Sequence, residues 1–264
     1  MGRIIAITNA KGGVGKTSVA ANLAGAAAEA GHRVLAVDFD CQGSLTWHLG
    51  VDPEKQRGRT VYEALIRKVS LGGATVHTRH GIDLVPANLD LSAAEVDLLL
   101  EAEKARDWGK AFTWYEQLRN ILAPTREKYD LVLVDCQPSF GTLTINALVA
   151  ADACIVPLSC DYLSLRGLEQ LLATIRKVRA KWNSRLEIAG VLLTMYDSRT
   201  LHSREVAAAV RRELAGRVRV FETVIKRSVR FAEAPVAGEP ITVYDPVFEG
   251  TQAFRQLVRE VITA

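Results

Sequence analysis

Cysteine is scarce in this chain, and the few cysteines are scattered. The 264 residues include Cys41, Cys136, Cys154 and Cys160, with no CxxC pair and no spacing typical of a zinc site. This pattern argues against a disulfide scaffold. It fits a reducing cytosol, where isolated thiols pack as small apolar side chains.

The sequence also lacks a long apolar run, a signal peptide, internal repeats and a linker rich in Pro, Gly or Ser. The apolar stretch 143–157 is interrupted by Asn146 and Asp152 and is too short to span a bilayer. Residues 1–8 read as a short strand that leads directly into a glycine-rich loop. We therefore expect a cytoplasmic protein that forms a single domain over residues 1–264.

Neither positive nor negative charge is in large excess over the whole chain, but the charged residues are unevenly distributed along it. The net charge is +3, whereas the stretch from Arg166 to Arg230 holds 15 Lys and Arg against six Asp and Glu. Such asymmetry favours a polyanionic partner for the C-terminal third. Solvated helix faces are the alternative interpretation.

Apolar segments rich in Val, Ile and Leu alternate with helical patterns along the chain. Continuous apolar strands are typical of a parallel sheet covered on both faces, so we expect an α/β fold with one doubly wound, mostly parallel sheet. The expected strands are Arg3–Thr8, Arg33–Asp38, Ile82–Pro86, Leu131–Asp135, Cys154–Pro157, Ile188–Thr194 and Val218–Val224. The expected helices are Thr17–Ala30, Ser92–Lys104, Ala111–Leu122, Thr142–Ala150, Leu165–Lys181, Ser203–Leu214 and Gly250–Ile262, with Ser92 and Glu95 at capping-box spacing.

A glycine-rich loop lies between the first strand and the first helix, which is the context that a phosphate-binding loop requires. Its glycines allow backbone N–H groups to surround phosphate oxygens, and the helix N-terminus adds its dipole. We expect Lys16 to meet the β- and γ-phosphates and the Thr17 hydroxyl to bind magnesium. The predicted nucleotide contacts are Lys11, Gly12, Gly13, Val14, Gly15, Lys16, Thr17 and Ser18.

The loop departs from the common GxxxxGK[ST] pattern, since Ala10 stands at the first glycine and Lys11 adds an early lysine. KGGVGKT resembles the deviant Walker-A box of the ParA/MinD/NifH superfamily of P-loop ATPases. The resemblance implies that Lys11 reaches the nucleotide of a partner subunit. The bound triphosphate would then control a homodimer.

Three aspartates follow predicted strands and complete the nucleotide site. Asp38 and Asp40 leave the second strand, at the edge where parallel sheets bind ligands, and resemble the DxD switch of the family. The resemblance implies that Asp40 orients the attacking water and that Asp38 supports the magnesium shell. Asp135 ends a Walker-B-like strand and is expected to hold Mg²⁺ through water. Catalysis is thus predicted for Lys11, Lys16 and Asp40, with ATP and Mg²⁺ as cofactors.

Similarity to the ParA branch continues through most of the chain. Residues 192–200 (LLTMYDSRT) resemble a ParA signature, and residues 229–235 (VRFAEAP) resemble the segment that lines the base pocket. We therefore expect Met195, Asp197 and Arg227 to contact the nucleotide. Cys41, Gln137, Lys226 and Ser228 depart from the family pattern. Only two residues precede the first strand, so we expect no N-terminal helix-turn-helix extension.

The resemblance implies an ATP-dependent switch that binds DNA without sequence preference and partitions chromosomes or plasmids with a ParB-like partner. It would associate with the nucleoid, and we predict DNA contacts for Arg176, Arg179, Arg212 and Arg219. The alternatives are a positioning ATPase for a protein cargo, a MinD-like regulator at the membrane surface and a metabolic P-loop kinase. An apolar stripe in the last helix, at Phe254, Leu257, Val258, Val261 and Ile262, is expected to face the core, so we predict no stable membrane association.

Overall fold

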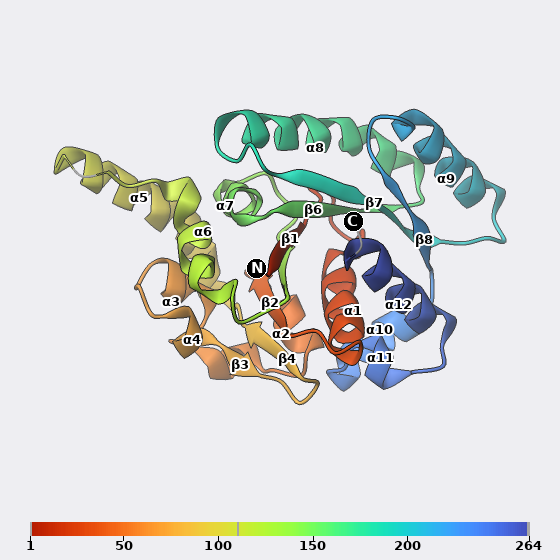
Figure 1. The fold of residues 1–264 in the computed structure, drawn as a ribbon, viewed down its shortest axis with the longest axis horizontal. Coiled ribbons are helices and arrows are strands. Elements are labelled where there is room, and N and C mark those ends of the chain that lie inside the picture. Colours follow the sequence, from red (N-terminus) through yellow and green to blue (C-terminus); the bar gives the residue numbers. More distant parts are fainter. Residues whose placement is uncertain (1, 110, 263–264) are drawn as a thin grey trace.

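The computed structural model describes residues 2–109 and 111–262 and contains an eight-stranded sheet (Figure 1). The strand order is β3-β4-β2-β5-β1-β6-β7-β8, and every neighbouring pair is parallel except β3 with β4. The strands are β1 Arg3–Ile7, β2 Val34–Phe39, β3 Val76–His77, β4 Ile82–Val85, β5 Leu131–Cys136, β6 Ala153–Ser159, β7 Glu187–Tyr196 and β8 Val220–Lys226. The expected mostly parallel sheet is confirmed.

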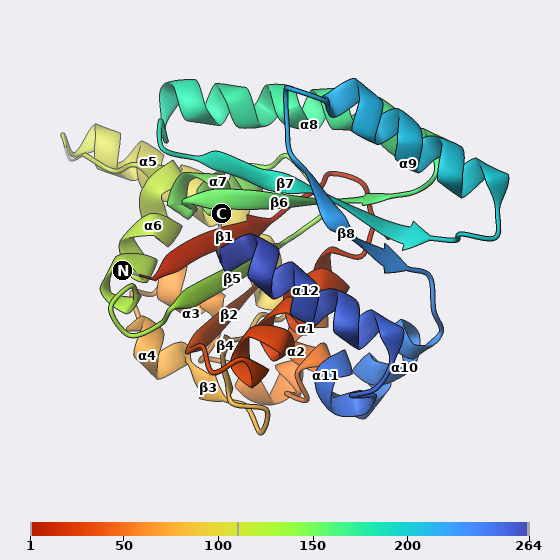
Figure 2. The same cartoon turned by 45° about the vertical axis from the view of Figure 1, so that its right-hand side comes forward.

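Helices cover both faces of the sheet (Figures 1 and 2). On one face lie α1 Lys16–Glu29, α2 Ser44–His48, α10 Arg230–Ala237, α11 Ile241–Tyr244 and α12 Glu249–Ile262. On the other lie α3 Val61–Leu65, α4 Leu71–Ala74, α5 Ala94–Asp107, α6 Gln117–Leu122, α7 Thr142–Ala150, α8 Tyr162–Lys181 and α9 Leu201–Leu214. Short 3-10 turns, at Pro53–Gln56, Leu89–Ala93, Trp114–Glu116 and Ala123–Thr125, join several of these elements.

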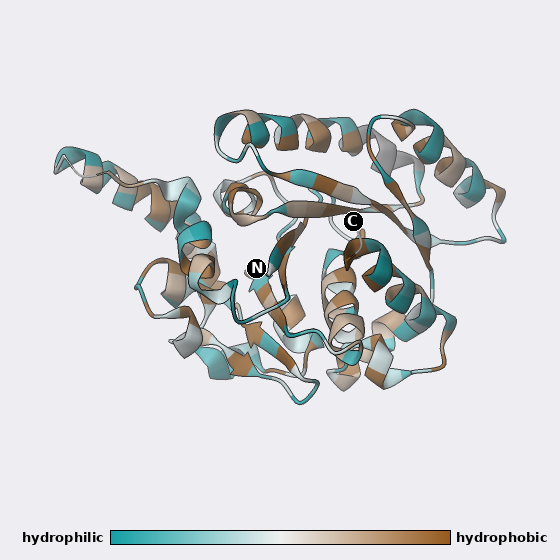
Figure 3. Cartoon of the chain, viewed as in Figure 1, coloured by the Kyte–Doolittle hydropathy of each residue, from teal (hydrophilic) through white to brown (hydrophobic). Residues whose placement is uncertain are grey.

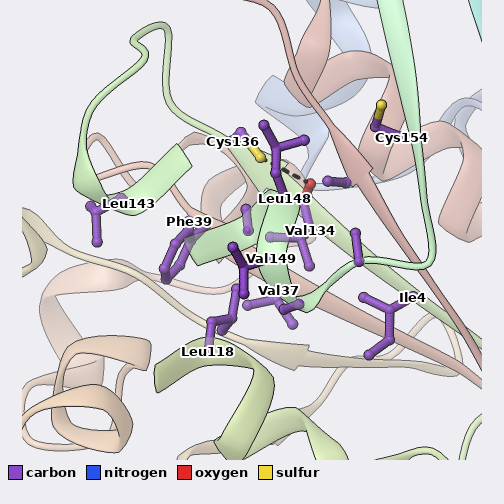
Figure 4. Packing of buried hydrophobic residues seen from close by; sticks show 14 of the residues in the cluster. Ile4, Val37, Phe39, Leu118, Val134, Cys136, Leu143, Leu148, Val149 and Cys154 are labelled. Atoms are coloured by element: carbon purple, nitrogen blue, oxygen red, sulfur yellow. Dashed lines mark hydrogen bonds between the residues drawn. The ribbon is translucent and has the colours of Figure 1, made fainter. Parts of the chain in front are cut away.

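The core divides into two layers because successive side chains of a strand point to opposite faces. In β1, Ile4 and Ala6 belong to one apolar cluster, whereas Ile5 and Ile7 belong to the other. Figure 4 shows part of the first cluster, in which side chains of β1, β2 and β5 lie in one layer with side chains of the covering helices α6 and α7. Figure 3 shows the central strands coloured mainly as apolar, which is why they read as continuous hydrophobic runs in the sequence.

The predicted strands and most predicted helices match the structure to within three residues at each end. Two local expectations are wrong. Residues 111–113 are not helical, because a 3-10 turn precedes α6, and α5 begins at Ala94 rather than in a capping box at Ser92. A capping box occurs instead at Thr60, whose backbone and side chain bond Glu63 at the start of α3.

The terminal helix α12 packs its apolar stripe inward, as expected. Phe254, Leu257, Val258 and Val261 are buried, and Ile262 at the end of the helix is 43% exposed. Among the described residues, no helix combines the length and the apolar character needed to cross a membrane.

Candidate nucleotide-binding site

The site lies at the carboxyl edge of the sheet, where β1 is hydrogen-bonded to β5 on one side and β6 on the other. Strands β2 and β5 lead out of this edge at Phe39 and Cys136, and the loop 8–15 leads from β1 into α1. Crevices at such positions of a doubly wound sheet are where ligands bind. The topology thus brings together the glycine loop and all three predicted aspartates.

The backbone of the glycine loop adopts a conformation that requires glycine at two positions. Gly13 has φ 72° and Gly15 has φ 87°, and Gly15 is the N-cap of α1. The Thr194 hydroxyl, at the end of β7, donates to the Val14 carbonyl at 2.8 Å. Because this bond fixes the last part of the loop against the sheet, the N-terminus of α1 is held in place facing the loop.

The two lysines of the loop have different environments. Lys16 is buried, its Nζ donates to the Lys11 carbonyl at 3.1 Å, and burial lowers the pKa of its ammonium while Asp135 opposes the shift. Lys11 is more exposed, and its Nζ lies 2.6 Å from Oδ1 of Asp161, just after β6. Ser159 donates to the other oxygen of Asp161 at 2.5 Å. Lys16 therefore faces into the loop, whereas Lys11 is held by a carboxylate beyond it.

Both carboxylate oxygens of Asp38 accept hydrogen bonds from other residues of the chain. Its Oδ2 accepts from the Thr46 hydroxyl at 2.7 Å and from the Thr46 N–H at 2.8 Å, and its Oδ1 accepts from the Asp40 N–H at 3.3 Å. Burial raises the pKa of Asp38 to about 6, although the Thr46 bonds lower it. The Thr46 hydroxyl in turn accepts from the Ala87 N–H. Asp38 thus anchors the loop after β2 to α2 and to the end of β4.

Asp135 differs from Asp38 in its hydrogen bonding. It is fully buried next to Asp38 in the sheet register, and neither carboxylate oxygen has a hydrogen-bond partner among the described residues. Burial, then the charge of Asp38, raises the pKa of Asp135 well above its usual range, and nearby Thr17 and Lys16 oppose the rise only in part. A buried carboxylate without a partner is costly unless a cation or donor satisfies it. Asp135 and Thr17 are therefore oxygen donors that fit Mg²⁺.

Asp40 follows in a short turn at the mouth of the site. Its Oδ1 accepts from the Gln42 N–H at 3.0 Å, and its carbonyl accepts from the Gly43 N–H, so the turn is closed without the proline that Cys41 replaces. The carboxylate is partly exposed. It remains accessible to a water molecule at this edge of the sheet.

Two cavities adjoin the loop and meet at Met195, which is 41% exposed and has the positive φ of 52° at the end of β7. A cavity of about 240 Å³ is lined by apolar groups and loop residues: Gly15, Ser18, Met195, Ile225, Arg227, Ser228, Phe231 and Phe254. Its size and apolar lining suit an adenine base. A cavity of about 500 Å³ on the other side includes Lys11, Gly12, Gly13, Asp161, Asp197 and Arg227.

The structure separates the residues predicted for the base pocket. Met195 and Arg227 line both cavities, whereas Asp197 lines only the second. The Asp197 carboxylate is bidentate to Arg199, at 2.8 and 2.9 Å, and this bond lowers its pKa to about 2. Lys226, a departure from the family pattern, is paired with Glu249 at 2.7 Å.

The basic C-terminal third contains two kinds of arginine. Arg176 and Arg179 on α8 and Arg212 on α9 are exposed, and no ion pair of the described residues includes them. Arg219 instead donates to the Glu260 carbonyl at 3.2 Å and lies 3.5 Å from its carboxylate. Arg219 therefore ties β8 to α12, unlike the other three.

Sequence reasoning missed three side chains that organise the site. Thr46 is hydrogen-bonded to Asp38, and Asp161 is paired with Lys11. Glu95 of α5 is hydrogen-bonded to the loop after Asp135. Thr46 carries no local signal, and Glu95 was noted only for a capping box with Ser92, because the partners of these side chains lie 8 and 42 residues away.

The chain combines a parallel sheet, a GKT loop at its carboxyl edge, a buried lysine and a buried aspartate without a hydrogen-bond partner among the described residues. This combination defines a P-loop nucleoside triphosphatase. A family model described as an AAA domain (AAA_31) matches residues 2–188. The chromosome partitioning protein ParA of Caulobacter vibrioides is 44% identical over 264 residues, 99% of this chain and 94% of that protein. The sporulation initiation inhibitor protein Soj of Bacillus subtilis is 40% identical, over 99% of this chain and 98% of that protein.

Among solved structures, a cobyrinic acid a,c-diamide synthase from Mycobacterium smegmatis with bound ATP analogue and magnesium matches with a TM-score of 0.84 and 37% identity. The match covers 98% of this chain and 93% of that one. Together with the fold and the loop, these similarities show that the chain belongs to the ParA/MinD family of P-loop ATPases.

Proposed function

We propose that this protein is an ATP-dependent dimerising switch that binds DNA without sequence preference and partitions DNA with a ParB-like partner. The observation that carries the proposal is the division of labour between the two loop lysines. Lys16 is buried in the loop, whereas Lys11 is held outside it by Asp161. One lysine is thus suited to the nucleotide of its own subunit and the other to a nucleotide that a second subunit presents.

The reaction is hydrolysis of ATP to ADP and phosphate. Lys16 and the loop N–H groups hold the phosphates, and Asp40 orients the attacking water at the exposed edge. Thr17 and Asp135 would hold Mg²⁺, which supplies charge neutralisation on the phosphates when bound. Asp38, whose oxygens are bonded to Thr46 and Asp40, supports this arrangement through the position of the Asp40 turn.

Dimer formation depends on an exchange of partners by Lys11. In the single chain its ammonium is paired with Asp161, and both side chains are partly exposed, at 36% and 44%. A partly exposed ion pair is weak, so a triphosphate that presents several negative oxygens competes well for the lysine. ADP, which lacks the γ-phosphate, competes less well. The nucleotide thereby controls the stability of the dimer.

DNA binding is assigned to the exposed arginines Arg176, Arg179 and Arg212. Phosphate contacts of this kind are non-specific and depend steeply on salt. A dimer doubles the number of such contacts, so DNA affinity follows the nucleotide state. The protein would then be nucleoid-associated while ATP is bound, and the ParB-like partner would stimulate hydrolysis and release it. The name of the Caulobacter vibrioides relative, a chromosome partitioning protein, supports a role in partitioning.

The test is binding of the purified protein to duplexes of two unrelated sequences, with ATP, with ADP and without nucleotide, over a salt series. We expect binding only with ATP, equal affinity for both duplexes and a steep decrease with salt. The triple variant Arg176→Ala, Arg179→Ala, Arg212→Ala should lower the slope of log K against log salt by about 0.9 for each phosphate that the arginines no longer neutralise. Binding that is independent of nucleotide, or absent while ATP-dependent dimers form, would contradict the DNA role and favour a protein cargo or a membrane surface.

A further inference from the structure

The loop that follows Asp135 is tied to a helix that the nucleotide motifs do not include. Glu95 lies in the first turn of α5, and its Oε1 accepts from the side-chain amide of Gln137 at 2.9 Å. The same oxygen accepts from the backbone N–H of Leu143 at 3.3 Å, in the first turn of α7. One carboxylate thus contacts both ends of the segment 137–143.

Glu95 takes the place of a missing helix cap. The N-cap of α7 is Gly141, which has no side chain to accept from the first N–H groups. A Cβ atom built on Gly141 would lie 2.4 Å from Oε1 of Glu95, so the carboxylate lies directly against this glycine. A negative charge at a helix N-terminus is stabilising. Glu95 therefore fixes the position at which α7 begins.

Further hydrogen bonds pass the constraint along the loop towards Asp135. The Gln137 amide that contacts Glu95 also donates to the Ser139 hydroxyl at 3.0 Å. That hydroxyl accepts from the Gly141 N–H at 3.2 Å, and the Ser139 N–H donates to the Gln137 carbonyl at 2.9 Å. Gln137 departs from the family pattern, and its partner Glu95 gives this departure a structural role.

We propose that Glu95 is a positioning residue for ATP hydrolysis: through Gln137 and the N-terminus of α7, it fixes the loop that follows Asp135. The inference rests on the proposed ATPase function and names a residue that acts through the loop, without contact to the nucleotide. Loss of Glu95 lets the loop move while Lys16 and the glycine loop still hold the nucleotide. The chemical step is therefore affected more than nucleotide binding.

The test compares Glu95→Ala, Glu95→Gln, Gln137→Ala and the double variant Glu95→Ala, Gln137→Ala in the full chain. Glu103→Ala is the matched control, since Glu103 lies on the same helix, is exposed and, among the described residues, is paired with Arg106 of α5 at 3.7 Å. The measurements are kcat of ATP hydrolysis with Mg²⁺, the Kd for a fluorescent ATP analogue, and hydrogen exchange of residues 136–147 without nucleotide.

We expect Glu95→Ala to lower kcat by about tenfold with Kd within about twofold of the wild type. The double variant should resemble Glu95→Ala, because the two residues share one contact. The kcat of Glu95→Gln should lie between the values of the wild type and Glu95→Ala, since the amide oxygen of Gln still accepts from the Leu143 N–H. The Leu143 amide should exchange faster in Glu95→Ala and unchanged in Glu103→Ala.

The inference is overturned if Glu95→Ala keeps wild-type kcat, or if kcat and Kd change together in all variants, including the control. It is also overturned if exchange at Leu143 is unchanged. If the wild type does not hydrolyse ATP, the proposed function fails by itself, and the exchange result alone decides whether Glu95 fixes the loop.

Discussion

Replacement of Asp135 by Asn should stabilise the protein without nucleotide while abolishing the proposed Mg²⁺-dependent hydrolysis of ATP. Asp135 is buried, lies beside Asp38 in the sheet and has no hydrogen-bond partner among the described residues. Asn keeps the shape of the side chain and removes the charge. Sites that bind a cation often hold such strain in the free protein, at a cost in stability.

The expected magnitude follows from the removal of an uncompensated buried charge. We expect a net gain of about 1 to 2 kcal/mol in the free energy of unfolding. The gain is limited because the buried Asn amide still lacks hydrogen-bond partners. In a protein of this size the gain raises Tm by about 2 to 8 °C. The pKa of Asp135 is raised in the folded state, so its ionisation cost is absent below the usual value of 3.8 and grows as pH rises. The advantage of Asn should therefore shrink as pH falls from 7 towards 4.

The assay is thermal unfolding with a metal chelator present, at several pH values, followed by titration with ATP and Mg²⁺. Ligand binding should raise Tm of the wild type and much less that of Asp135→Asn. Asp130→Asn is the matched control, because Asp130 precedes the same strand but is paired with Arg33, and its loss should lower Tm. A lower Tm in Asp135→Asn, or a gain that does not depend on pH, would contradict a destabilising buried charge at Asp135.

Two further predictions concern buried polar groups of α2. Thr46→Val should lower the free energy of unfolding by about 1 to 3 kcal/mol in chemical denaturation, because Asp38 and the Ala87 N–H both lose a buried partner. Thr46→Ser is its control, since it keeps the hydroxyl. Burial lowers the pKa of His48 from 6.5 to about 4, so the unfolded state binds more protons between these values and stability falls with acidification. Between pH 6.5 and 5 the wild type should lose about 1 to 2 kcal/mol in the free energy of unfolding through His48, and His48→Gln should not show this loss. An equal loss in the wild type and in His48→Gln would contradict the prediction.

Much of the fold could be predicted because it depends on local patterns. Buried parallel strands read as continuous apolar runs, and α7, predicted at Thr142–Ala150, begins and ends as expected. Several elements escaped prediction: the two-residue edge strand β3, the short helices α2, α3, α4 and α11, and the eight-residue helix α10. Segments of two to five residues have too little periodicity to detect, and they form because the neighbouring core covers them.

The site was predictable where a motif fixes the backbone and less so where distant residues meet. The positions of Lys16 and Asp135 follow from a strand, a loop and a helix of known order. The difference between Asp38, bonded to Thr46, and Asp135, bonded to no described group, depends on contacts between separate elements. For the same reason, the sequence did not distinguish Arg219, tied to Glu260, from the exposed arginines.

The most direct test of the central claim is the mass of the protein in solution with ATP and Mg²⁺, measured by light scattering. The Asp40→Ala background should slow hydrolysis and preserve the ATP-bound state. We expect a monomer without nucleotide or with ADP, a dimer with ATP, and a monomer under all conditions when Lys11→Ala is added. Lys11→Ala should still bind ATP, because Lys16 remains in the loop. A dimer that forms without ATP, or one that persists in Lys11→Ala, would contradict a nucleotide-controlled switch in which Lys11 senses the nucleotide of the partner.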